Sequence, residues 1–150
     1  MKRTLTLIAI FCAVVPALAN ASFTGNWSGS GGATFGPGNN MNCERVSFQF
    51  EQGFQFFEIR RGDAVCGFNR FNFPTGMLTI ENGVLKDRGL AVGMIGPDYF
   101  HLSYSYRPGT LNILDVRLLG KGAISVVHTT ADTQRGTTEI RGNLGNEFPF

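Results

Sequence analysis

The side chains in this sequence that could support catalysis are few and widely spaced. There are two histidines, His101 and His128, and each lies in a segment whose pattern predicts a β-strand. His101 shares its segment with Ser103 and Ser105, and a serine beside a base could attack a carbonyl group. Residues two and four positions apart in a strand only share a face, however, and no G-x-S-x-G turn accompanies them. Phosphate-binding loops, calcium-binding loops and zinc-protease motifs are also absent from the sequence. We therefore expect a protein that is not an enzyme and holds neither a metal nor a cofactor.

The first residues have the composition of a secretory signal. Lys2 and Arg3 precede an apolar run that ends in an A-x-A cleavage site. We expect residues 1–19 to be removed, with cleavage after residue 21 as the alternative. Residues 20–150 would then form a single exported domain, located in the periplasm or in the extracellular medium.

The exported chain would carry no net charge. The whole sequence has 13 Lys+Arg and 11 Asp+Glu, and the signal segment takes with it two basic residues and no acidic ones, so 11 of each remain. Binding to nucleic acid or to an anionic membrane surface needs a clustered basic excess, so neither partner is expected. Beyond the signal segment no apolar run approaches the length of about 20 residues of a transmembrane helix.

Cysteine usage agrees with export. Cys12 falls in the signal segment, which leaves Cys43 and Cys66 in the exported chain. In an oxidising compartment an even pair predicts one disulfide, which would stabilise a loop of this size by about 3 kcal/mol. A metal site is the alternative, but no second pair of His or Cys stands at ligand spacing.

The composition predicts an all-β fold. All 20 glycines and 13 of the 14 phenylalanines follow the signal segment, and turn sequences recur at even spacing between aromatic and β-branched runs. We expect about eight to ten antiparallel strands in a single up-and-down barrel, because closure removes exposed edges, with a β-sandwich as the alternative. The glycine-rich segment 30–42 is expected to form a long loop after the first strand.

Most of the side chains that we expect to face the barrel lumen come from one predicted β-hairpin. Folding the segment 44–61 about Gln52–Gly53 sets Val46 opposite Ile59 and Phe48 opposite Phe57 on one apolar face. The expected lumen residues are Val46, Phe48, Phe50, Phe57, Ile59 and Phe68. Such side chains either fill a small barrel or surround one small apolar ligand, and the sequence leaves both readings open.

The segment Gly25–Gly29 reads G-x-W-x-G at the start of the predicted meander. A G-x-W motif in this position resembles the calycin group, which comprises lipocalins, fatty-acid-binding proteins and avidin. The resemblance implies that Trp27 closes one end of the barrel and that Arg141, on the predicted last strand, packs over its ring. The chain also resembles small secreted bacterial β-barrel proteins of uncharacterised function, through the segments 82–85 and 89–95. This likeness implies a lipocalin-like fold and no particular activity.

Three functions remain as expectations. The first is a monomeric, exported, non-enzymatic barrel that binds a small apolar molecule in its lumen. The second is a protein-binding module such as a secreted protease inhibitor, with Phe54 and Phe56 as candidate exposed contacts. The third is an outer-membrane barrel, prompted by the terminal Phe150. Membrane strands span about 9 to 11 residues, however, and many of the strands predicted here are shorter.

Overall fold

The computed structural model describes residues 22–120 and 122–147, and all regular structure within them is β-strand. The expected signal segment lies outside the described residues. The strands are β1 (Gly25–Phe35), β2 (Asn39–Gln52), β3 (Phe56–Cys66), β4 (Asn69–Asn72), β5 (Gly76–Glu81), β6 (Val84–Asp87), β7 (Leu90–Ile95), β8 (Tyr99–Tyr104), β9 (Thr110–Gly120), β10 (Ala123–Asp132) and β11 (Gly136–Asn146).

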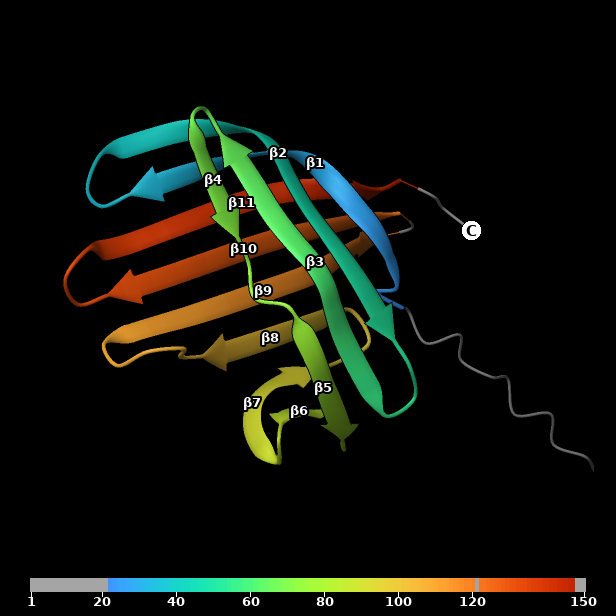
Figure 1. Ribbon diagram of the computed structural model, residues 1–150. Coiled ribbons are helices and arrows are strands. Elements are labelled where there is room, and N and C mark those ends of the chain that lie inside the picture. The colour runs from blue at the N-terminus through green and yellow to red at the C-terminus, as the bar shows by residue number, and fades with distance from the viewer. Residues whose placement is uncertain (1–21, 121, 148–150) are drawn as a thin grey trace, which may run out of the picture.

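These strands form one antiparallel sheet that closes on itself (Figure 1). The hydrogen-bonded order is β2-β1-β11-β10-β9-β8-β7-β6-β5-β3, and pairing of β2 with β3 completes a ring through 10 strands. The predicted antiparallel barrel is therefore confirmed, in preference to the sandwich. The sheet has 11 strands, slightly more than expected, because β3 pairs along one edge with two short strands in succession, β4 and β5.

The glycine-rich segment 30–42 is mostly strand, so the expected long loop is wrong. β1 continues to Phe35 and β2 begins at Asn39, which leaves only a short turn between them. Glycine inside β1 permits a close approach to β11, because a Cβ atom on Gly31 would collide with the main-chain oxygen of Arg141. Glycine in a strand and glycine in a loop look alike in composition, which explains the error.

The β2–β3 hairpin has a longer turn than expected. Phe50 pairs with Ile59, whereas a turn at Gln52–Gly53 predicted Val46 in that place. The pairing differs because β3 begins only at Phe56. The shift is four positions at Phe50, and a β-bulge beyond it makes the shift five at Val46, which pairs with Ala64. The alternation holds from Val46 to Phe50 and from Phe57 to Ile59, so these apolar side chains point into the barrel.

Most of the expected lumen residues belong to a packed core. The buried members are Val46, Phe48, Phe50, Phe57 and Ile59. The ring centroids of Phe57 and Phe100 lie 4.6 Å apart, and those of Phe50 and Phe100 lie 5.2 Å apart. These rings contact one another and fill the part of the interior that they occupy.

Phe68 does not belong to this interior, so its expected place in the lumen is wrong. β3 continues through Gly62 and Asp63 to Cys66, and Phe68 lies fully exposed in the turn to β4. The expected place of Phe68 depends on a turn at Gly62–Asp63, and the turn falls instead at Gly67 and Phe68.

Candidate functional site

Trp27 lies buried near the start of β1, at an end of the barrel filled by aromatic rings. Its indole Nε1–H donates a hydrogen bond to the main-chain oxygen of Phe23, 2.8 Å away. The Phe23 ring in turn meets Phe100 edge-on, with centroids 5.0 Å apart. This end of the barrel is therefore plugged by side chains.

Arg141 does not pack over the ring of Trp27, so the arrangement implied by the calycin resemblance is wrong for this residue. In the register between β1 and β11, Trp27 pairs with Asn146 whereas Arg141 pairs with Gly32. Arg141 also follows a residue that faces the core, so its side chain points outward, where it pairs with Glu139.

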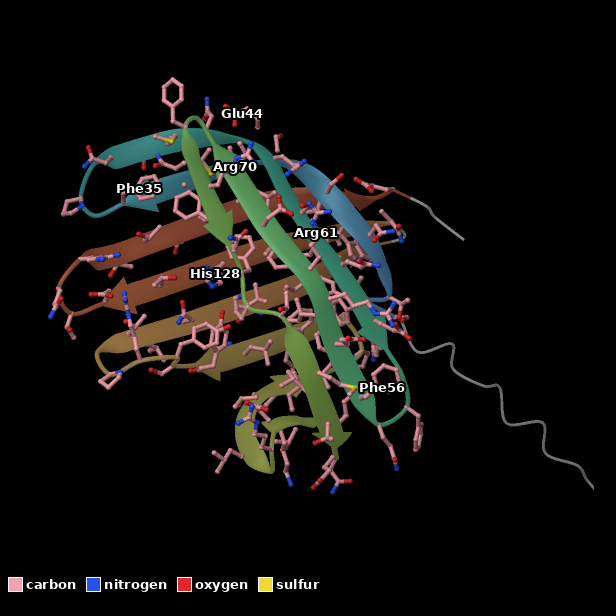
Figure 2. The ribbon with its side chains drawn as sticks, viewed as in Figure 1. Phe35, Glu44, Phe56, Arg61, Arg70 and His128 are labelled. Atoms are coloured by element: carbon pink, nitrogen blue, oxygen red, sulfur yellow. A yellow bond between two sulfur atoms is a disulfide. The ribbon has the colours of Figure 1, made fainter. Side chains whose placement is uncertain are left out.

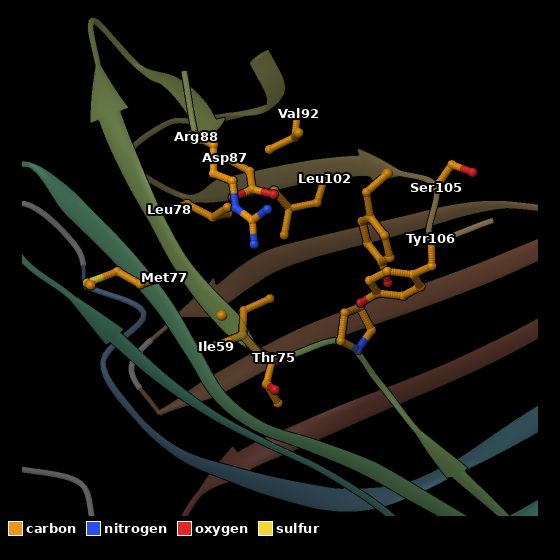
Figure 3. Close-up of a pocket in the computed structure, with 13 residues that line it drawn as sticks. Ile59, Thr75, Met77, Leu78, Asp87, Arg88, Val92, Leu102, Ser105 and Tyr106 are labelled. Atoms are coloured by element: carbon orange, nitrogen blue, oxygen red, sulfur yellow. The ribbon is translucent and has the colours of Figure 1, made fainter. Parts of the chain in front are cut away.

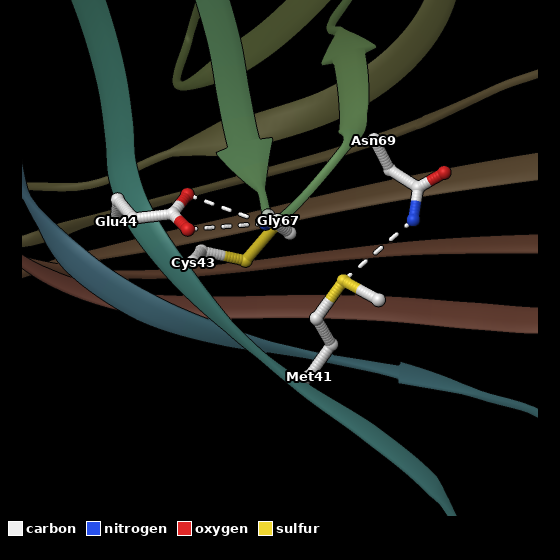
Figure 4. The surroundings of a disulfide bond; sticks show 6 residues. Met41, Cys43, Glu44, Gly67 and Asn69 are labelled. Carbon is white, nitrogen blue, oxygen red and sulfur yellow. Dashed lines mark hydrogen bonds between the residues drawn. A yellow bond between two sulfur atoms is a disulfide. The ribbon is translucent and has the colours of Figure 1, made fainter.

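The predicted disulfide between Cys43 and Cys66 is present (Figure 4). Simple alternation placed Cys43 on the opposite face from Val46, yet both residues are buried. Between them β2 advances three residues for two on β1, a β-bulge at Glu44–Arg45 that turns Cys43 inward. The Glu44 carboxylate also accepts a hydrogen bond from the N–H of Gly67, 3.3 Å away. A disulfide in this place is consistent with an exported protein.

A cleft of about 610 Å³, here called the side cleft, opens where the chain passes from β4 to β5 (Figure 3). Its apolar floor is formed by Ile59, Leu78, Val92 and Leu102, from β3, β5, β7 and β8. The volume lies within the range of about 300 to 1,000 Å³ that is usual for small-molecule sites.

Polar and aromatic groups surround this floor. The rings of Tyr104 and Tyr106 lie 5.0 Å apart along one wall. Burial raises the pKa of the Tyr104 hydroxyl, which therefore stays protonated. On the opposite wall the Arg88 guanidinium extends over the hollow, as Figure 3 shows. Arg88 is 94% exposed, and its Nε lies 4.0 Å from the carboxylate of Asp87.

A second cleft of about 470 Å³, here called the β4 cleft, lies between β4 and the inner face of β9, β10 and β11. Pro74 and Tyr106 line both clefts, which therefore adjoin. The three buried polar side chains of the described residues, Thr110, Asn112 and His128, all line the β4 cleft. Polar groups inside the barrel thus gather at its open side.

His128 is held in this cleft by an aromatic ring and a hydroxyl group. Its ring centroid lies 4.7 Å from that of Phe73, and its Nε2 lies 3.2 Å from the Tyr104 hydroxyl. Burial lowers the pKa of His128 to about 4, so the ring is neutral at neutral pH. Beside it the Thr130 hydroxyl donates a hydrogen bond to the Asn112 side-chain oxygen, at 2.9 Å.

The other histidine faces away from both clefts. His101 lies on the outer face of β8, and its Nδ1 is 2.7 Å from a carboxylate oxygen of Asp115. Ser103 shares that outer face, whereas Ser105 lies beyond the end of β8 and donates its hydroxyl proton to the main-chain oxygen of Arg107. The two histidines therefore lie on opposite sides of the sheet. In the part of the chain that the structure describes, no group of three or more His, Cys, Asp or Glu could hold a metal ion.

Sequence reasoning did not find either cleft. Both are bordered by the segments 73–76 and 105–109, which their proline and glycine residues identify only as turns. The sequence signal that could have indicated the side cleft is the pair of aromatic residues Tyr104 and Tyr106 close to a turn.

The fold is an antiparallel β-barrel with an apolar core and two adjoining clefts that open into its interior, an architecture compatible with the calycin group that the motif at Gly25–Gly29 resembles. No protein-family model matches the sequence, and no curated protein matches it. The link to calycins therefore consists of the fold and this short motif. Among the described residues there is no helix long and apolar enough to cross a membrane.

Proposed function

We propose that this protein is an exported, non-enzymatic barrel that binds a small, largely apolar molecule in the side cleft. The observation that carries this proposal is the apolar floor of an open cleft of about 610 Å³, beside the part of the barrel interior that phenylalanine rings fill. Ile59, one of the expected lumen residues, lines this cleft, so the proposed ligand site is the part of the barrel interior that opens between β5 and β8.

The residues that line the side cleft indicate which chemical class of ligand would fit it. Ile59, Leu78, Val92 and Leu102 offer an apolar surface, and the exposed ring of Tyr106 offers a face for stacking. Arg88 makes only a long contact with Asp87, so its guanidinium can meet an anionic group at one end of the ligand. A ligand with an apolar body that contains a flat ring, and with one anionic end, would fit both the apolar floor and Arg88.

Two further observations support an exported binding protein. The disulfide favours an oxidising compartment, in agreement with the expected signal segment. The two histidines lie on opposite faces of the sheet, so they cannot act together on one substrate. We do not favour an outer-membrane barrel, because such barrels have polar interiors and the interior here is apolar.

Titration with N-phenyl-1-naphthylamine, an uncharged dye that emits more strongly in apolar surroundings, tests this function. The wild-type protein should bind the dye, and Thr75→Trp, which adds a large ring at the edge of the side cleft, should bind it at least tenfold more weakly. Thr137→Trp on β11 is the matched control, because Thr137 is also exposed but lies outside the lining of both clefts. Equal dye binding by the two variants, or none by the wild type, would contradict the proposal.

The protein-binding alternative has a separate observation in its favour. Phe54 and Phe68 are both fully exposed, and they lie in the turns at the two ends of β3. Phe56, the other candidate contact, is half-buried and packs against Gly53. Each exposed ring would offer an aromatic contact to a protein partner.

A further inference from the structure

One edge of β4 has no strand beside it. β4 ends the hydrogen-bonded order of the sheet, and among the described residues it pairs with β3 alone. The N–H of Phe73 donates to the main-chain oxygen of Gly62 on β3, at 2.9 Å. Main-chain groups of successive residues point to opposite edges of a strand, so those of Phe71 also face β3 and those of Arg70 and Asn72 face the free edge. Two N–H and two C=O groups are thus placed to pair with a further strand.

The free edge borders open space. Arg70, Phe71 and Asn72 line one wall of the β4 cleft, and Thr130 and Thr138 stand on the opposite wall. An added strand would lie about 4.8 Å from β4. Its main-chain groups would meet those of β4, and its inward side chains would enter the cleft.

The charge at this edge is positive. Arg70 forms no ion pair or side-chain hydrogen bond within the described residues, and it lines both the β4 cleft and the hollow on the outer face of β3. Arg107, the other arginine of the β4 cleft, is already paired with Asp132 at 2.7 Å. Arg70 is therefore the cation that remains available to a partner.

The outer hollow adds to this positive charge. Its lining includes four arginines, Arg45, Arg60, Arg61 and Arg70, and a single carboxylate, Asp63. Arg45 and Arg61 share that carboxylate at 2.7 and 3.0 Å, and Figure 2 shows Arg61 and Arg70 on the neighbouring strands β3 and β4. Arg60 is paired with glutamates of β2 and β3. Because Asp63 is shared by two guanidinium groups and Arg70 has no ion pair among the described residues, the hollow has an excess of positive charge. This excess complements an acidic ligand.

We propose that the free edge of β4 binds an extended, acidic peptide segment of a protein partner by adding it to the sheet as a strand. Alternate side chains of the peptide face outward beside Arg70 and inward beside Phe71, so acidic residues should alternate with apolar ones. A second copy of this chain is a poorer partner, because pairing two β4 edges would bring their arginines together. This site adjoins the side cleft, but it depends on the edge of β4 and is tested with a different probe, so failure of one proposal leaves the other in place.

The probe for this site is a capped, fluorescein-labelled peptide of sequence Glu-Val-Glu-Phe-Glu, and its binding to the full chain is followed by fluorescence anisotropy. Affinity should fall as salt is added, and a matched peptide with lysine in place of glutamate should not bind. Arg70→Glu should weaken binding about fivefold or more, whereas Arg135→Glu, an exposed arginine in the β10–β11 turn, should leave it unchanged.

Methylation of main-chain nitrogen separates strand addition from simple charge attraction. Methylating the peptide nitrogens that face β4 should weaken binding about tenfold or more, whereas methylating the alternate nitrogens should have little effect. Equal loss for the two methylated peptides, or no binding by about 1 mM of the parent peptide, would overturn the proposal. Because these peptides differ while the protein stays wild type, the result does not depend on how any variant folds.

Discussion

Acid should destabilise this protein through His128. The ring is 6% exposed, packs on Phe73, and lies with its Nε2 near the hydroxyl of Tyr104. Burial lowers the pKa of His128 from 6.5 to about 4, because a charged imidazole would lose its hydration in this site. The unfolded chain therefore takes up a proton at a higher pH than the folded one.

The size of the effect follows from the two pKa values. A base whose pKa is depressed by folding contributes its full stability above the unfolded value and loses it as the pH falls toward the folded value. Between pH 7 and pH 5 the unfolded chain gains most of one proton at His128 while the folded protein gains almost none. The free energy of unfolding should consequently fall by about 2 kcal/mol over that interval.

Urea unfolding at pH 7, 6 and 5 measures this change, with the fluorescence of Trp27, the one tryptophan in the sequence, as the signal. His128→Gln, which keeps a polar side chain that does not titrate, should remove most of the pH dependence whatever its own stability at pH 7. His101→Gln on the outer face is the matched control and should retain the fall. If the wild type and His128→Gln lost the same free energy between pH 7 and pH 5, the assigned effect of burial would be refuted.

Two further predictions concern the covalent and aromatic core. The double variant Cys43→Ala/Cys66→Ala should lower the free energy of unfolding by about 3 kcal/mol in urea, because the unfolded chain regains the freedom of the closed loop; an unchanged midpoint would contradict that role. Phe57→Ala should cost about 3 to 5 kcal/mol, because Phe57 is fully buried among aromatic rings, whereas Phe54→Ala should change stability by less than about 0.5 kcal/mol. Thermal unfolding of the two variants compares them directly, and similar losses would refute the packing described here.

The fold was largely predictable because its signals are local. Turn sequences and alternating apolar residues indicate strands wherever a strand has one face toward the core. The interior residues from Val46 to Ile59 were predicted correctly despite an error in hairpin register, because β2 alternates without a break from Val46 to Phe50 and the bulge on β3 comes after Ile59. Cys43 and Cys66 were predicted from compartment chemistry, but the bulge at Glu44–Arg45 that lets them meet was not. A bulge reverses the alternation and leaves almost no trace in the sequence.

The errors at Arg141 and Phe68 have the same kind of cause. Arg141 was placed by its position on the last strand, whereas its direction is decided by parity within β11 and its distance from Trp27 by the register with β1. Phe68 was placed by assuming a turn at Gly62–Asp63 and continuing the apolar face beyond it, whereas these two residues belong to β3. The prediction for Arg141 needed the register of a strand and that for Phe68 needed its end, and both depend on pairing with distant segments.

The clefts could not be predicted from the sequence, because they result from the pairing of one edge of β3 with two different strands. Its one edge pairs first with β5, at Phe56–Ile59, and then with β4, at Asp63–Cys66. The chain must cross between these two positions through Phe73 to Thr75, and the ring closes through β5 alone. β4 is left with a free edge beside the inner face of β9, β10 and β11, where polar residues replace apolar ones. The same break in pairing thus opens both candidate binding sites, one apolar and one with an unpaired strand edge, while the rest of the barrel is closed and filled.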